Sequence, residues 1–172
     1  MSACGKQDRK GKQCEVEVEG RLEKAVELFK EGYNCAQSVF GAYADLYEIP
    51  ADMAFRISAS FGAGVGRMRE VCGCVSGMSL VAGFETGATE GADRDAKAHN
   101  YAVVQEMAKK FRERSGGSII CKELLGLKKP EGSTVPAERN ADYYKKRPCV
   151  ELIGVACDII EETFDLGGHP LA

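Results

Sequence analysis

Residues 93–114 read DRDAKAHNYAVVQEMAKKFRER, and they give the clearest secondary-structure signal in the chain. Their apolar side chains recur at the spacing of one helix face, between charged residues: Tyr101, Val104, Ala108 and Phe111. Similar but shorter patterns predict helices over residues 21–31, 35–46, 50–61, 70–84, 118–125 and 148–164. No segment alternates with period two for long enough to require a strand. The sequence therefore predicts an all-α protein, a compact single-domain bundle of about six to seven helices.

The chain has 172 residues, the usual size of one domain. Residues 1–18 are polar and lack periodicity, so we expect a flexible N-terminal tail followed by one helical cysteine-site domain over residues 19–172. The net charge is −3, from 23 basic and 26 acidic residues, and no basic stripe is interleaved with aromatic residues. This balance argues against nucleic acid as a partner.

Membrane insertion and secretion are also not expected. The longest nearly uncharged run, residues 71–84, has 14 residues, whereas a membrane span needs about 20. The N-terminal residues carry positive charge, but no apolar stretch follows them, so they lack the pattern of a signal peptide. We therefore expect a cytoplasmic protein.

Eight cysteines are unusual for a protein of the reducing cytosol, where a disulfide framework is not expected. Metal binding or redox chemistry is the leading explanation. Four of the cysteines lie close to a predicted helix start, where unpaired N–H groups and the helix dipole favour a thiolate. We call them the four-cysteine set: Cys35, Cys72, Cys121 and Cys149.

The remaining cysteines separate by position. Cys157 lies about 12 Å beyond Cys149 along the same predicted helix, so we expect it in the core. In a regular helix Cys74 would be rotated by ~200° from Cys72, and only an irregular first turn would let both face one site. The last two fall in the predicted tail: Cys4 and Cys14.

Four sulfurs cannot converge as bare thiolates. At ~4 Å and an effective dielectric constant of about 20, each pair of thiolates would repel by about 4 kcal/mol, whereas each helix end returns only about 0.3–2 kcal/mol. A converged site therefore contains a metal centre, a disulfide or mostly protonated thiols. Structural zinc usually shows paired C-x2-C knuckles, and the sequence has none. Ligands scattered over four helices suit an iron–sulfur cluster or a redox dithiol better.

A glycine-rich loop, FGAGVGRMR over residues 61–69, precedes Cys72. It does not fit the dinucleotide-binding fingerprint, because Arg67 replaces the third glycine and a helical pattern precedes the loop in place of a strand. We expect a tight backbone turn against the cysteine site. Arg67 and Arg69 would then be placed to contact an anionic substrate or partner.

Several stretches, in this order, resemble the C_GCAxxG_C_C family of redox-active proteins: GYNCAQS (32–38), FGAGVGRM (61–68) leading to VCGCVSG (71–77), GSIICKELLG (117–126) and PC (148–149). Together they extend over roughly residues 20–165. The resemblance marks the four-cysteine set as the family's characteristic cysteines. Cys74 departs from the family motif, which has alanine there, and this leaves open whether a fifth thiol joins the site.

The resemblance implies a redox-active four-cysteine site. It extends to a domain of split-Soret cytochromes, which implies electron transfer, but the chain has no C-x-x-C-H and so no c-type haem is expected. We therefore expect an iron–sulfur electron-transfer protein, with [2Fe-2S] as one form of the cluster and a redox protein as its partner. The metal ligands would be the four-cysteine set.

Two other functions stay open for the same residues. In a thiol–disulfide oxidoreductase, Cys72 would attack, because the glycine loop leaves its surroundings open and Arg67 and Arg69 would favour its thiolate. Cys74, or one of the other three cysteines of the set, would then resolve the mixed disulfide. In the second alternative, the four-cysteine set would bind structural zinc.

Residues 70–84 predict a helix that is apolar on nearly every face and carries Gly73 and Gly77. Such a helix must be covered on all sides. The two glycines would permit another helix to approach closely, so we expect a homodimer formed through this helix. Enclosure of the helix by its own chain is the alternative.

Overall fold

The computed structural model describes residues 20–166. The predicted tail, with Cys4 and Cys14, lies outside this range. Within it the chain forms no strand, and eight α-helices account for most of the residues: α1 (Arg21–Lys30), α2 (Cys35–Tyr43), α3 (Ala51–Ser58), α4 (Gly73–Thr86), α5 (Arg94–Arg114), α6 (Cys121–Leu124), α7 (Ala141–Lys146) and α8 (Cys149–Thr163). Two short 3-10 helices follow α2 and α3: η1 (Ala44–Tyr47) and η2 (Ala59–Phe61). The all-α prediction is confirmed, and none of the described helices is both long and apolar enough to cross a membrane.

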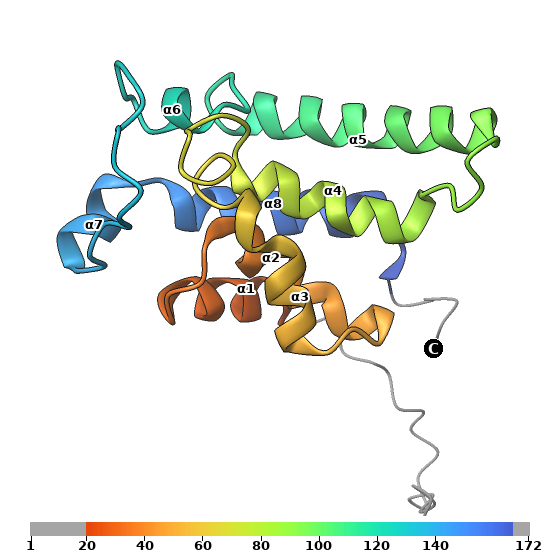
Figure 1. The fold of residues 1–172 in the computed structure, drawn as a ribbon, viewed down its shortest axis with the longest axis horizontal. Coiled ribbons are helices and arrows are strands. Elements are labelled where there is room, and N and C mark those ends of the chain that lie inside the picture. The colour runs from red at the N-terminus through yellow and green to blue at the C-terminus, as the bar shows by residue number, and fades with distance from the viewer. Residues whose placement is uncertain (1–19, 167–172) are drawn as a thin grey trace, which may run out of the picture.

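The helices are stacked in layers (Figure 1). The long helix α5 runs along one side of the molecule, α4 and α8 lie beneath it, and α1 and α3 lie on the opposite side. Helix α2 joins these layers, since it packs most extensively against α4 and α1 and also contacts α3 and α8. Because α4 and α8 begin at the same end of the molecule, close to α6, their first residues are placed near one another (Figure 1).

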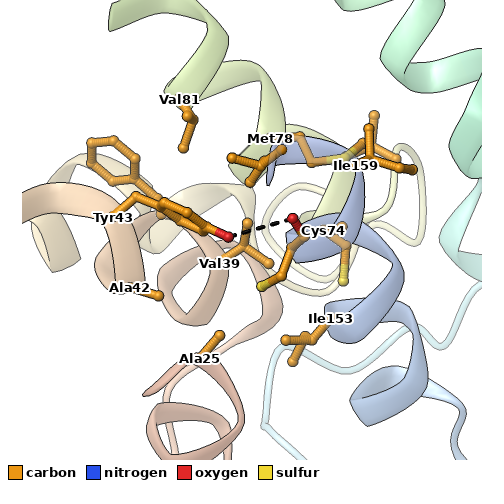
Figure 2. Packing of buried hydrophobic residues seen from close by; sticks show 14 of the residues in the cluster. Ala25, Val39, Ala42, Tyr43, Cys74, Met78, Val81, Ile153 and Ile159 are labelled. Carbon is orange, nitrogen blue, oxygen red and sulfur yellow. Dashed lines mark hydrogen bonds between the residues drawn. The ribbon is translucent and has the colours of Figure 1, made fainter. Parts of the chain in front are cut away.

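The core lies between α2, α4 and α8 (Figure 2). Val39 and Tyr43 of α2 face Met78 of α4, and Ile153 of α8 closes the cluster; all four side chains are fully buried or nearly so. The Tyr43 hydroxyl donates a hydrogen bond to the backbone carbonyl of Cys157 over 3.5 Å, the dashed line of Figure 2. Cys157 is itself fully buried and thus lies in the core, as expected.

Two glycines bring α4 close to α2. A Cβ on Gly77 would lie 2.8 Å from the Cβ of Val39, and a Cβ on Gly73 would lie 3.1 Å from the Cβ of Cys35. These glycines are therefore used within the chain, and the expectation that they serve an interface between subunits was wrong. The homodimer itself stays a prediction, but its interface would not lie at this part of α4.

Two helix starts and one whole helix differ from the sequence prediction. Helix α4 begins at Gly73, with Cys72 as its N-cap, and does not extend back to residue 70. Helix α6 begins at Cys121, while Ser118 accepts a hydrogen bond from the Ile120 N–H at 2.9 Å in the turn before it. Helix α7 was not predicted at all, because the segment follows two prolines and has no apolar stripe.

Candidate functional site

The glycine-rich loop forms a left-handed turn. Five consecutive residues, 63–67, have positive φ angles between 54° and 72°. Three of the five are not glycine and cost about 1–2 kcal/mol each in this conformation: Ala63, Val65 and Arg67. A Cβ on Gly64 would lie 2.7 Å from the Cβ of Cys121, so the turn packs directly against this cysteine. The expected tight turn against the cysteine site is therefore present.

Backbone pairing places Cys72 beside Cys121. The Cys72 N–H donates to the carbonyl of Ile119 at 2.8 Å, and the Cys121 N–H donates to the carbonyl of Glu70 at 2.7 Å. An isolated antiparallel bridge between Val71 and Ile120 lies between these two hydrogen bonds. Residues far apart in sequence thus deliver two of the four cysteines to one place.

Cys35 and Cys149 come from the first turns of α2 and α8. The Cys35 sulfur accepts hydrogen bonds from the thiols of Cys149 and Cys74, and these contacts, with a smaller contribution from Arg139, hold the pKa of Cys35 well below its ordinary value. The same hydrogen bonds raise the pKa values of Cys149 and Cys74. Cys35 therefore lies beside two other thiols, and of these three cysteines it is the one whose pKa is lowered.

Cys74 can face the same site as Cys72 because Cys72 lies just before helix α4 and not within it. As the N-cap of α4, Cys72 has an extended conformation (φ −56°, ψ 135°), so the opposed placement expected for a regular helix does not arise. The Cys74 thiol is hydrogen-bonded to both Cys35 and Cys72. An irregular first turn thus brings a fifth sulfur to the site, a possibility that the sequence left open.

Cys121 completes the group. Burial raises its pKa to about 11, and Arg69, whose Nη1 lies 3.9 Å from the sulfur, opposes this shift. Cys72 and Cys35 both act electrostatically on Cys121 and on Cys149. Each of these four cysteines and Cys74 therefore interacts with at least two of the others, and we call these residues the five-cysteine group.

A pocket of about 390 Å³ is lined by three of the five cysteines. Cys35, Cys121 and Cys149 line it, and Cys35 is half-buried there. Cys72 and Cys74 are 4% and 0% exposed and lie outside its wall. A ligand in this pocket would meet Cys35 and Cys149 without any movement of the core.

The rest of the pocket wall is rich in arginine. Arg67 and Arg69 are the two residues that the sequence pointed to, and Arg69 is only 2% exposed. Arg139 and Arg147 also line the pocket. The sequence analysis missed them, since nothing but their charge distinguishes them among 23 basic residues. Their place follows from long-range packing, as Arg139 donates to the carbonyls of Phe29 and Tyr33.

The donor atoms of the site suit a metal centre, but their positions in space do not. Thiolates delivered by four separate elements are the donors that iron–sulfur clusters use, and zinc accepts them too. Within residues 20–166, however, no three or more Cys, His, Asp or Glu side chains are arranged to hold a metal ion. The arrangement described is a group of free cysteines among which the pKa of Cys35 is lowered.

Comparison with known proteins gives one result. A family model described as "Putative redox-active protein (C_GCAxxG_C_C)" matches residues 33–163. No curated protein matches the chain, and no solved structure does. The matched range runs from the residue before Asn34 to the last residue of α8, so it contains the complete five-cysteine group and all four arginines of the pocket.

Proposed function

Because the chain belongs to the C_GCAxxG_C_C family of redox-active proteins, we propose that the five-cysteine group is its redox centre and works by thiol–disulfide exchange. One observation carries this proposal. Cys35 lies on the wall of an open pocket beside Cys149 and Cys74, and hydrogen bonding with these two thiols lowers its pKa. A thiolate stabilised in this way is the reactive form of cysteine, and a second thiol beside it can resolve a mixed disulfide.

The exchange balances in two steps. The Cys35 thiolate attacks one sulfur of a substrate disulfide, the substrate S–S bond breaks, and one substrate thiolate leaves with a mixed disulfide remaining on Cys35. Cys149 then loses its proton to water and attacks the Cys35 sulfur, which releases the second substrate thiolate. The substrate disulfide is reduced to two thiols, and Cys35 and Cys149 are oxidised to a disulfide.

Cys35 is preferred over Cys72 as the attacking residue on grounds of access. The expectation for Cys72 assumed that the glycine loop leaves it open, but Cys72 is buried and outside the pocket wall. Arg69 contacts Cys121, and the arginine that acts on Cys35 is Arg139. For the same reason Cys149, on the pocket wall, is a better resolving residue than the fully buried Cys74.

An iron–sulfur centre is the second candidate, and the four-cysteine set favours it. Its four thiols come from four separate elements and meet in one group. They are also the cysteines to which the sequence resemblance points. These residues would be the ligands, and a bound cluster would supply one-electron transfer to a partner protein. Cys74 would stay a protonated neighbour of the ligands.

Anaerobic purification followed by visible absorption and by iron, zinc and acid-labile sulfide analysis separates the candidates. We expect colourless, metal-free protein in which one thiol reacts with iodoacetamide at pH 7 roughly tenfold or more faster than an ordinary cysteine. Cys35→Ser should remove the fast thiol. Cys157→Ser, in the core and away from the pocket, is the matched control and should retain it.

Each other result has a definite meaning. Iron and sulfide in stoichiometric amount would overturn thiol exchange in favour of the cluster, and stoichiometric zinc in colourless protein would identify a structural metal site. If Cys72→Ser removes the fast thiol and Cys35→Ser does not, the attacking residue has been assigned wrongly.

A further inference from the structure

Three of the four arginines of the pocket surround a single carboxylate. Glu131 accepts hydrogen bonds from Arg69 and lies 3.3 Å from Arg67 and 3.9 Å from Arg147. Among the described residues that line the pocket there is no Asp or Glu, whereas four are arginine. With Glu131 included, the fixed charges around the pocket sum to about +3, or about +2 when Cys35 is a thiolate.

Glu131 belongs to the segment that covers the pocket between α6 and α7. Thr134, Pro136 and Ala137 of this segment line the pocket, and the Nε of Arg67 donates to the Ser133 carbonyl at 2.7 Å. The segment is otherwise exposed from residue 132 to 138. It is therefore attached to the pocket wall mainly through its contacts with arginine side chains.

Arg139 and Arg147 are held in place by groups other than Glu131. Arg139 donates to two backbone carbonyls and lies 4.3 Å above the centre of the Phe29 ring. Arg147 lies 4.8 Å above the Tyr143 ring. A planar, fixed guanidinium group is suited to binding carboxylate or phosphate, and preorganised groups lose little entropy when they do so.

We propose that the pocket binds a small thiol or disulfide that carries negative charge, and that its acid group takes the place of Glu131 on Arg67, Arg69 and Arg147. The sulfur of the ligand would then lie beside Cys35. The volume of about 390 Å³ falls within the range of small-molecule sites, about 300–1,000 Å³. The sulfur step rests on the proposed thiol exchange, whereas the anion site does not.

Three small disulfides of similar length and different charge test the substrate class: dithiodipropionate with two negative charges, hydroxyethyl disulfide with none, and cystamine with two positive charges. The rate at which each disulfide oxidises the protein is divided by the rate at which it oxidises dithiothreitol, an uncharged thiol, so that differences in intrinsic reactivity are removed. We expect dithiodipropionate to be preferred over hydroxyethyl disulfide by roughly tenfold or more, and cystamine to be disfavoured. Added salt should reduce the preference.

Octanedioate, a sulfur-free dicarboxylate of the same chain length, tests the anion site by itself through calorimetry. Glu131→Gln should raise its affinity about fivefold or more, because an internal competitor has been removed. Glu138→Gln changes an exposed glutamate of the same segment and is the matched control that should leave the affinity unchanged. Arg147→Gln should weaken binding and lower the preference for dithiodipropionate.

The two proposals fail in different ways. If octanedioate binds but no disulfide oxidises the protein, the anion site stands and thiol exchange is wrong. If the protein reacts with all three disulfides at equal normalised rates and octanedioate does not bind, thiol exchange stands and the anion site is wrong. Reaction with a protein disulfide alone, or unchanged octanedioate affinity in Glu131→Gln, would also overturn the inference.

Discussion

Asn34 fixes the first turn of α2 and thereby the position of Cys35. Its side chain accepts a hydrogen bond from the Gln37 N–H at 3.0 Å, the Gln37 side chain accepts one from the Asn34 N–H, and the Asn34 amide donates to the Ala59 carbonyl at 2.8 Å. Asn34→Ala should lower the free energy of unfolding by about 1–2 kcal/mol. It should also slow alkylation of Cys35, because a frayed helix start moves this thiol away from Cys149.

The matched control is Asp93→Ala, which removes the same kind of cap from α5, where Asp93 accepts from the Ala96 N–H at 2.8 Å. Urea unfolding should register a loss of about 1 kcal/mol, while the alkylation rate of Cys35 stays unchanged. Equal effects of both substitutions on alkylation would contradict a local role for Asn34.

Local sequence predicted such residues well, because a cap or a helix start depends on its neighbours in the chain. The sequence placed the cysteines of the set close to helix starts, which is where the structure has them. The sequence did not point to three charged residues of the site: Glu131, Arg139 and Arg147. Their place at the pocket depends on partners more than a hundred residues away, as for Arg139 and Phe29, or on loops without any periodic pattern.

Helix α4 contains two glycines in opposite environments, and they allow a paired test. An added Cβ at Gly77 would press on Val39, whereas an added Cβ at Gly83 meets nothing within 4 Å. Gly77→Ala should therefore destabilise the protein by about 1–3 kcal/mol. Gly83→Ala should stabilise it by about 0.5–1 kcal/mol, since alanine favours a helix interior. Urea unfolding of both variants gives the two signs, and a stabilised Gly77→Ala would show that α4 and α2 are not in close contact.

Helices could be predicted from the sequence where an apolar stripe marks them, and were missed where no such stripe is present. Helix α5 has such a stripe, but α7, with the sequence ADYYKK, is held by the packing of Tyr144 on Phe29 at 6.0 Å between ring centres. The Asn140 cap was the one local signal for α7. The left-handed conformation of Ala63 and Val65 had no signal, because these residue types disfavour it.

The buried thiols make the stability of the whole molecule fall at alkaline pH. Burial raises the pKa of Cys121 to about 11 and that of Cys157 to about 12. The folded protein therefore keeps protons that the unfolded chain has already lost, and its free energy of unfolding should fall as pH rises from about 9 to about 12. Each thiol contributes at most about 1.4 kcal/mol per pH unit.

Urea unfolding between about pH 8 and about pH 11 measures this slope. Cys157→Ala removes one of the two thiols and should make the slope shallower, whatever the substitution costs at neutral pH. A slope that stays the same in the variant would show that Cys157 does not titrate on unfolding.

The left-handed turn at residues 63–67 also has a consequence for motion. The non-glycine residues of this turn adopt a conformation that they disfavour, and contacts with Cys121 and with the segment around Glu70 hold them there. We therefore expect the turn to be among the first parts of the native protein to open locally. Amide hydrogen exchange at Glu70, Cys72 and Cys121, whose N–H groups donate across this segment, should therefore proceed through an opening that leaves α2, α4 and α8 intact. Such a fluctuation would let solvent reach sulfurs that the static pocket does not expose.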